Sequence, residues 1–246
     1  MYRSTSAGLI WTIACLHGAQ ATAQSAPEGW QLGAIGVFDA SPLIGDDLDV
    51  LGLPFVAYRT EQYSIGLNGA RYTVLDHEGQ SVAFVLAPRF SQIDDDEAEF
   101  AGMDRDIALD FGVAFAQTSP SGFSVAVTAL ADVTDAHAGQ EIDLRFSHRM
   151  SGLPLSVYAG ATWQSDGLTE YLYGVRSDET AAGRPAFSPG AAITPYIGVS
   201  GAFPVTDQAA IIGSIEVRQL PDDITDSPIV DQSSASRATI GVVFNF

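Results

Sequence analysis

The segment Ser236–Phe246 alternates apolar with polar or small residues and ends on an aromatic side chain. Ala238, Ile240, Val242, Phe244 and Phe246 share one side, and Arg237, Thr239, Gly241 and Asn245 share the other. Successive side chains of a strand point to opposite faces, so one face can meet lipid while the other meets a polar interior. The pattern is typical of the closing strand of an outer-membrane β-barrel. It predicts an all-β chain that spans a bilayer as an antiparallel barrel.

Residues 1–23 are expected to be a cleaved export signal. Arg3 supplies the positive charge, Ala7–Ala14 the apolar stretch, and Ala21-Thr22-Ala23 the small-residue cleavage site. The apolar stretch is shorter than the roughly 20 residues that a membrane helix needs. One barrel domain over residues 24–246 is therefore expected. The only cysteine, Cys15, lies within the signal, which argues against disulfides and thiol catalysis in the mature chain.

Three internal segments show nearly ideal strand alternation. In Asp106–Ala116 the apolar side chains from Ile107 to Phe115 alternate with small or acidic ones. Glu141–Ser147 sets Ile142, Leu144 and Phe146 against Glu141, Asp143 and Arg145, and Leu155–Gln164 repeats the pattern. A soluble sheet has no need of so many charges directly behind an apolar face. These segments therefore support a barrel with a lipid-facing outside and a polar inside.

The remaining strands are expected near residues 30–38, 50–60, 62–67, 70–76, 81–91, 121–132, 192–203 and 208–218. Together with the four segments above, they make a barrel of about twelve strands. The region 62–76 is divided at Asn68-Gly69, because Asn-Gly favours a two-residue hairpin turn. One long strand there is the alternative, and it would change the strand count or the tilt.

The connections between these strands fall into a long class and a short class. The connections at 219–235, 166–191, 133–139 and 92–104 are long, and Pro204–Asp207, Arg149–Leu153 and Ser119–Ser121 are short. Barrels of this type carry long extracellular loops and short periplasmic turns. The acidic run Asp94–Glu99 is therefore expected to face the outside.

Charge and motif content limit the possible functions. The chain has 30 acidic residues against 11 basic residues, all of them arginine, which gives a formal net charge of -19. This balance argues against nucleic acid as a partner. Acidic loops could hold divalent cations, but solvated loops are the simpler interpretation. The histidines lack metal-ligand spacing, and the sequence suggests no cofactor, metal or catalytic site. Ser147-His148 is the one pair that a barrel hydrolase could use.

Charged residues on the expected inner faces carry both signs. They either line a conduction path or pair with one another and close the barrel, and the sequence leaves both readings open. Aromatic residues near strand ends are expected to anchor the barrel at the lipid interface. The candidate lumen-lining residues are Arg89, Asp106, Asp110, Glu141, Asp143, Arg145, Glu216, Arg218 and Arg237; the candidate interface residues are Trp30, Trp163, Phe244 and Phe246, with Tyr158 and Tyr171.

Several short motifs resemble the MipA/OmpV family of MltA-interacting outer-membrane proteins. They are Tyr173-Gly174-Val175, the segments Gly183–Gly190 and Asp226–Val230, and the Phe-ended last strand. Val50–Tyr58 is similar to the proline-containing second strand of that family. The chain departs from the family at Arg59-Thr60, where a Gly-Arg step is common, and before Tyr173, where a second aromatic is frequent.

The resemblance implies a non-enzymatic outer-membrane barrel with a scaffold role in murein assembly. Its partners would be outer-membrane lipid, a periplasmic murein synthase and a lytic transglycosylase. A scaffold must contact such enzymes from the periplasmic side, where the sequence offers only short turns and the segment Gln24–Glu28. A passive, porin-like channel for small solutes is the alternative function.

Overall fold

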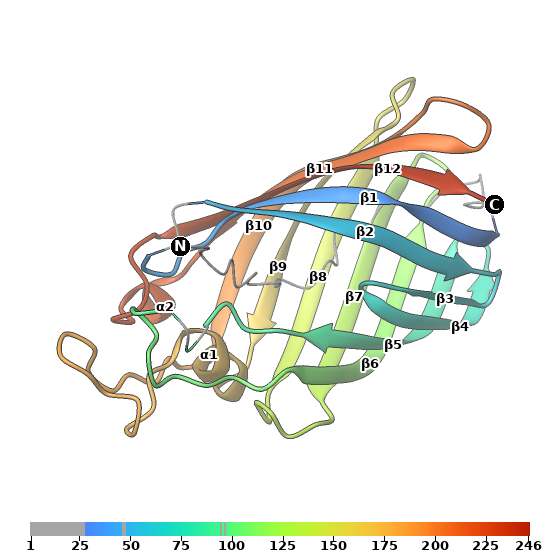
Figure 1. The fold of residues 1–246 in the computed structure, drawn as a ribbon. Coiled ribbons are helices and arrows are strands. Elements are labelled where there is room, and N and C mark those ends of the chain that lie inside the picture. Colours follow the sequence, from blue (N-terminus) through green and yellow to red (C-terminus); the bar gives the residue numbers. More distant parts are fainter. Residues whose placement is uncertain (1–27, 46–47, 94, 96) are drawn as a thin grey trace.

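The computed structural model describes residues 28–45, 48–93, 95 and 97–246 as one closed barrel (Figure 1). The expected signal, residues 1–23, lies outside the described residues. Every strand pairs antiparallel with its neighbours in sequence, and β12 closes the ring on β1. Among the residues that the structure describes, no helix is long and apolar enough to span a membrane.

The barrel has twelve strands, as the sequence predicts. They are β1 (Gly29–Ala40), β2 (Asp49–Arg59), β3 (Tyr63–Gly66), β4 (Gly69–His77), β5 (Gln80–Arg89), β6 (Ala108–Thr118), β7 (Phe123–Asp132), β8 (Gln140–Arg149), β9 (Leu155–Gln164), β10 (Ala192–Pro204), β11 (Ala209–Gln219) and β12 (Ser234–Asn245). The bounds of β9 match the prediction. No strand end differs from the prediction by more than two residues, and β6 is displaced by two at both ends, from Asp106–Ala116 to Ala108–Thr118.

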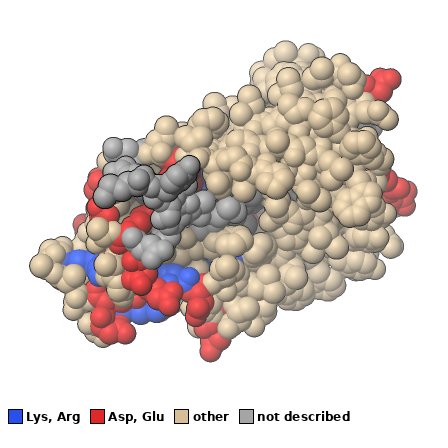
Figure 2. Space-filling model, in the orientation of Figure 1, with Lys and Arg blue, Asp and Glu red and all other residues tan. Residues whose placement is uncertain are grey.

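Exposure alternates along the strands, and this alternation separates the lipid face from the inner face. On β6, Phe111, Val113 and Phe115 are exposed, whereas Asp110 and Ala114, which have the opposite parity, are buried. Figure 2 shows the consequence on the visible face: acidic residues lie at both ends of the barrel, basic residues are visible toward the left end, and the wide band between the ends is largely uncharged. Such a band is what a bilayer core requires of the surface it contacts.

The hairpin of β3 and β4 is much shorter than the rest of the wall. Residues Leu67 and Asn68 form its turn, and Gly69 opens β4 with φ +101. A Cβ on Gly69 would lie 1.9 Å from the carbonyl oxygen of Leu86, so only glycine fits there. The prediction of two strands in this region is confirmed, but the turn is Leu67-Asn68, one residue before the predicted Asn68-Gly69. Because β3 ends so early, β2 pairs with it only through Ala57–Arg59.

The long loops gather at one end of the barrel, which we call the outer end (Figure 1). They include two helices that the sequence analysis missed, α1 (Asp166–Tyr173) and α2 (Asp222–Thr225). Buried apolar side chains from these loops and the adjoining strand ends pack into one cluster, here called the outer cap: Leu43, Ile93, Phe100, Met103, Tyr173, Val175, Ala192, Leu220, Ile224, Ile229, Val230 and Ala235.

Two buried arginines fasten the loops of the outer cap to one another. Arg105 forms a buried ion pair with Glu179 and donates hydrogen bonds to the carbonyls of Tyr171 (3.0 Å) and Gly174 (3.1 Å). Arg184 donates to the carbonyls of Glu99 and Ala101, both at 2.7 Å. Burial alone would raise the pKa of Glu179, but hydrogen bonds from Arg105 and the Arg176 backbone outweigh it and hold that pKa below its usual value.

Candidate functional site

Charged side chains cluster on the inner faces of several strands of the barrel. We call this group the inner belt, and it lies below the outer cap. The strands β1, β5, β6, β8, β11 and β12 contribute to it. Its members are Asp39, Arg89, Asp110, Glu141, Asp143, Arg145, Glu216, Arg218 and Arg237.

Arg89 on β5 organises one sector of the inner belt. Its Nη2 lies 2.6 Å from Oδ2 of Asp110 on β6, and its Nε donates to the same oxygen at 2.7 Å. Its Nη1 lies 3.2 Å from Oε2 of Glu141 on β8. The side chain of Arg89 is only 5% exposed. One buried guanidinium therefore compensates two carboxylates, which the low-polarity interior requires.

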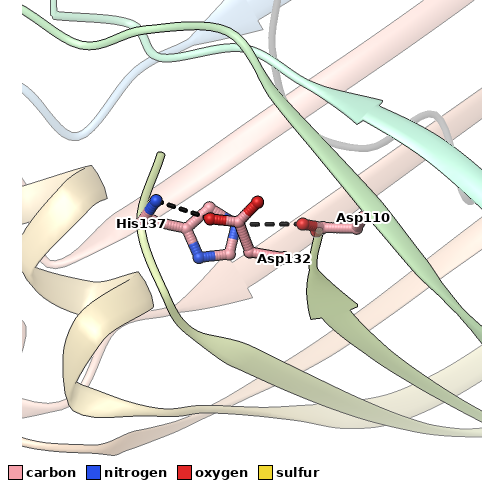
Figure 3. Close-up of side chains that lie close together, drawn as sticks. All are labelled: Asp110, Asp132 and His137. Atoms are coloured by element: carbon pink, nitrogen blue, oxygen red, sulfur yellow. Dashed lines mark hydrogen bonds and ion pairs between the residues drawn. The ribbon is translucent and has the colours of Figure 1, made fainter. Parts of the chain in front are cut away.

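His137, in the loop after β7, completes this sector (Figure 3). Its Nδ1 accepts the backbone N–H of Gly139 at 2.9 Å, and its Nε2 lies 2.9 Å from Oδ1 of Asp110. Because Nδ1 is an acceptor, Nε2 carries the ring hydrogen and donates a hydrogen bond to Asp110. Asp132 accepts the backbone N–H groups of His137 (2.7 Å) and Ala138 (2.9 Å).

The ligand atoms of Asp110, Asp132 and His137 lie within 4.8 Å of one another, which is close enough to consider a metal ion. Both ring nitrogens of His137 are already engaged in hydrogen bonds. A metal would need a free nitrogen lone pair, and the histidine would have to give up one of these bonds to supply it. The hydrogen bonds therefore account for the cluster as a brace between the β7–β8 loop and β6.

Arg145 on β8 organises the second sector together with two tyrosines. Its guanidinium carbon lies 4.5 Å from the ring centroid of Tyr158 and 5.1 Å from that of Tyr196. The Tyr196 hydroxyl accepts from Nε of Arg145 at 3.0 Å and donates to Asp143 at 2.8 Å. Cation–π contact and these hydrogen bonds together fix the arginine in the interior.

Two glycines make room for these tyrosine rings. Gly160 is the cross-strand neighbour of Tyr196, and Gly198 is that of Tyr158. A Cβ on Gly160 would meet the Tyr196 hydroxyl at 2.5 Å, and one on Gly198 would meet the Tyr158 hydroxyl at 2.4 Å. The space that these two glycines leave in the barrel interior is thus filled by tyrosine rings from the adjacent strands.

The last sector of the inner belt closes the ring toward β1. Glu216 on β11 accepts from Nε of Arg218 at 2.7 Å and lies 3.6 Å from Nη2 of Arg145. Arg237 on β12 forms an ion pair with Asp39 on β1. Gln92 follows β5, and its side-chain amide donates to Asp39 at 3.4 Å. The charges of the inner belt are therefore engaged with one another around the barrel.

The structure brings together all but one of the lumen-lining candidates. Asp106 is the exception, because it precedes β6, is exposed, and uses its carbonyl to accept the Tyr171 hydroxyl at 2.7 Å. The sequence analysis missed Asp39, although it shares the inner parity of β1 with Ile35 and Val37. It also missed His137, because the residue lies in a loop and no strand periodicity marks it.

The interface candidates divide into two groups. Trp30 is 53% exposed, and Phe244 and Phe246 are also exposed, all near the end of the barrel opposite the outer cap. Trp163 lies half-buried near the outer end of β9. The expectation for Tyr158 and Tyr171 is wrong: both are buried, Tyr158 against Arg145 and Tyr171 against His137. Strand-end position alone did not distinguish an outward aromatic from an inward one.

Ser147 and His148 do not form a catalytic pair. On β8, Ser147 has the same parity as the inward Asp143 and Arg145, whereas His148 has the same parity as the exposed Phe146. Adjacent residues of a strand point to opposite faces of the sheet. The hydroxyl and the imidazole therefore lie on opposite sides of the barrel wall, and a nucleophile and its base must touch.

The family model for the MltA-interacting protein MipA matches residues 32–246. The chain is 27% identical to the MltA-interacting protein of Escherichia coli K12, over 88% of this chain and 90% of that one. It is 24% identical to the putative outer membrane protein YiaT of the same strain, over 87% and 90%. It is also 24% identical to the outer membrane protein OmpV of Vibrio cholerae, over 89% and 88%.

Solved barrels of similar outline include the NanC porin, with a TM-score of 0.47 and 10% identity over 87% of this chain and 100% of that one. The CymD monoaromatic hydrocarbon channel has a TM-score of 0.46 and 10% identity over 96% and 93%. The family match spans nearly the whole described barrel. This chain is accordingly an outer-membrane β-barrel that belongs to the MltA-interacting protein family, MipA.

Proposed function

We propose that this protein is a non-enzymatic barrel that acts through contacts with other proteins of the cell envelope. The observation that supports this most is the pairing of charges in the barrel interior. The charged side chains of the inner belt contact one another, and the apolar side chains of the outer cap pack together between the outer loops. An interior occupied by structural pairing leaves the surfaces of the barrel as the place for function.

The partner class that we propose is the periplasmic murein enzymes, a lytic transglycosylase and a murein synthase. The support is family membership, together with relatives whose name is "MltA-interacting protein". Such enzymes would reach the barrel at the end opposite the outer cap. There the wall offers short turns, at residues 60–62, 78–79, 119–122, 150–154 and 205–208.

Exposed apolar side chains in two of these turns give a partner something to bind. Leu153 in the β8–β9 turn is 50% exposed, and Val205 in the β10–β11 turn is 61% exposed. Two adjacent hairpins therefore present apolar tips beyond the barrel wall. A contact limited to these two turns would bury little surface, and small interfaces are usually weak and transient.

Site-specific photo-crosslinking in cells tests this proposal. A crosslinking residue at Leu153 or Val205 should capture periplasmic murein enzymes, and one at the exposed Ala182 in an outer loop should not. The control shares the barrel and its expression level, and differs only in which end it probes. Failure to enrich any murein enzyme at either turn position would remove the scaffold role.

A passive channel for small solutes is the second candidate. The observation that favours it is the lining of the half of the barrel away from the outer cap, where small inward residues such as Gly33, Ala83 and Ser124 predominate over bulky ones. The mixed-sign inner belt would then act as the selectivity region. Planar-bilayer recording separates this candidate from the scaffold role.

A further inference from the structure

Two arginines outside the inner belt lie together on the inner face of the wall, in the half of the barrel away from the outer cap. Arg59 on β2 and Arg71 on β4 both pair with Ser64 on β3, which lies between them. Their outward neighbours Tyr58, Tyr63 and Tyr72 occupy the opposite face of the same strands. Arg59, Ser64 and Arg71 therefore form one row on the inner face, with the arginine Cα atoms about 10 Å apart at two strand spacings.

Neither arginine has a carboxylate partner among the residues that the structure describes. By contrast, Arg89, Arg145, Arg218 and Arg237 all form ion pairs in the inner belt. Asp76, further along β4, is exposed and interacts electrostatically with Arg71 over a longer distance, but it forms no ion pair with it. A half-buried guanidinium without a carboxylate in contact is unfavourable, and two of them side by side also repel each other. An anionic ligand would relieve both costs.

The inner face next to this row is apolar, which is unusual for this barrel. On β2, the inward positions beyond Arg59 and Ala57 are Phe55, Leu53 and Leu51. The facing positions on β1 include Ile35 and Val37. From Arg59 to Phe55 the strand rises about 13 Å, and to Leu51 about 26 Å. A charged end and a long apolar strip thus follow one another along a single strand.

The same strip borders a break in the pairing of the wall. Residues Asp49–Val56 of β2 pair with β1, and no described residue pairs with their other edge. Across the break, β4 reaches β5 no further than Leu86. Each edge carries a proline, Pro54 and Pro88, and proline in a sheet is confined to edges because it lacks the N–H donor. Val50 and Val56 on the outward face of β2 are exposed, so the unpaired edge of β2 borders lipid.

We propose that this region binds a single-chain anionic amphiphile with a carboxylate or phosphate head. Arg59 and Arg71 hold the head by charge-assisted hydrogen bonds, for which the guanidinium fork is suited. The chain lies along Phe55, Leu53 and Leu51 beside the unpaired edge of β2. The head of the ligand then lies in the barrel interior, and its chain lies next to the bilayer at the unpaired edge of β2. This site is independent of the proposed scaffold role, because it uses the inside of the wall.

Equilibrium dialysis of the barrel in nanodiscs of zwitterionic lipid tests the proposal, with empty nanodiscs as the reference. The probes are decanoate and decyl phosphate, each compared with acetate or inorganic phosphate. We expect saturable binding of at least one amphiphile and none of the short anions. Arg59→Gln with Arg71→Gln should weaken binding about tenfold or more. Leu53→Asn should weaken it while leaving the arginines in place.

Arg149→Gln is the matched control, because Arg149 lies near the same end of the barrel but is exposed on β8. It should bind as the native protein does, and heat-modifiable migration confirms that each variant is folded. Equal binding by the double arginine variant and the native barrel would overturn the proposal, as would the absence of binding to either amphiphile. Inorganic phosphate binding as tightly as decyl phosphate would overturn the assignment of the apolar strip.

Discussion

Arg89 and Asp110, on adjacent strands of the barrel, form a buried ion pair whose closest atoms, Nη2 and Oδ2, lie 2.6 Å apart. The same arginine reaches Glu141 on β8, three strands round from β5, and the same aspartate accepts a hydrogen bond from Nε2 of His137. Three strands and one loop are thus joined through two side chains. The pair therefore links the wall of the barrel to the loop after β7.

Removing Arg89 should destabilise the barrel strongly. Arg89→Met leaves Asp110 and Glu141 buried without their cation, and breaking a buried pair costs about 3–5 kcal/mol. Urea titration followed by heat-modifiable migration measures the loss. The control is Arg149→Met, an exposed position where the effect should stay below about 1 kcal/mol. Equal midpoints for the two variants would show that the inner belt does not stabilise the fold.

A charge on the lipid face should be less tolerated than one on the inner face. Phe111 is 44% exposed and stacks on Phe84 with the centroids 5.8 Å apart, so Phe111→Arg places a charge in lipid. The expected cost at mid-bilayer is about 2–4 kcal/mol. Asp110→Arg is a poor comparison, because it would set two arginines together.

Thr128→Arg is the better comparison, since Thr128 is the inward cross-strand neighbour of Asp143 and the new cation would face a carboxylate. Folded yield in lipid vesicles should be much lower for Phe111→Arg than for Thr128→Arg. The reverse order would mean that the inward and outward faces of these strands are exchanged.

The outer cap should loosen in acid. The folded-state pKa of Glu179 is lowered, so the stability from its pair with Arg105 is complete above the unfolded value of about 4.3. That stability is lost as the pH falls from there toward the folded-state pKa. Hydrogen exchange of residues 97–106 and 174–191, corrected for intrinsic rates, should show protection that is equal at pH 7 and 5 and falls below pH 4.

Glu179→Gln removes the charge that titrates, so its protection should be low throughout and lack the acid step. A native step that survives unchanged in this variant would assign the acid sensitivity to other carboxylates.

Phe246 should matter more for assembly than for the finished fold. Its side chain is 70% exposed, and its backbone N–H donates a hydrogen bond to the Trp30 carbonyl at 2.9 Å. Deleting Phe246 should therefore lower the amount inserted in cells while protein refolded in detergent migrates almost normally. The same loss in both settings would instead make the residue a determinant of stability.

Strand periodicity carried the prediction of the fold, because each wall residue has lipid on one side and a polar interior on the other. That contrast marks Phe111 against Asp110 and Phe146 against Arg145, and it sets the number of strands and their faces. The hairpin of β3 and β4 was located to within one residue, because the backbone beside its turn requires glycine at position 69. These are local signals, and sequence alone records them.

The pairing within the inner belt was not predictable in the same way. Arg89 and Glu141 meet across the barrel only because of strand stagger, which alternation does not specify. Tyr158 and Tyr171 were placed at the lipid interface, although Gly198 makes room for the first inside the wall and α1 carries the second inward. The helices α1 and α2 are short and take their stability from the outer cap, so their own sequences give little signal.

Single-channel recording in a planar bilayer tests the central claim, that the interior is occupied by paired charges beneath a packed cap and that function lies at the surfaces. A trimeric porin reconstituted in the same membrane provides the positive control. The account predicts that the native barrel gives no sustained open-channel current at neutral pH. A steady ohmic conductance of porin size would contradict it and favour the passive channel.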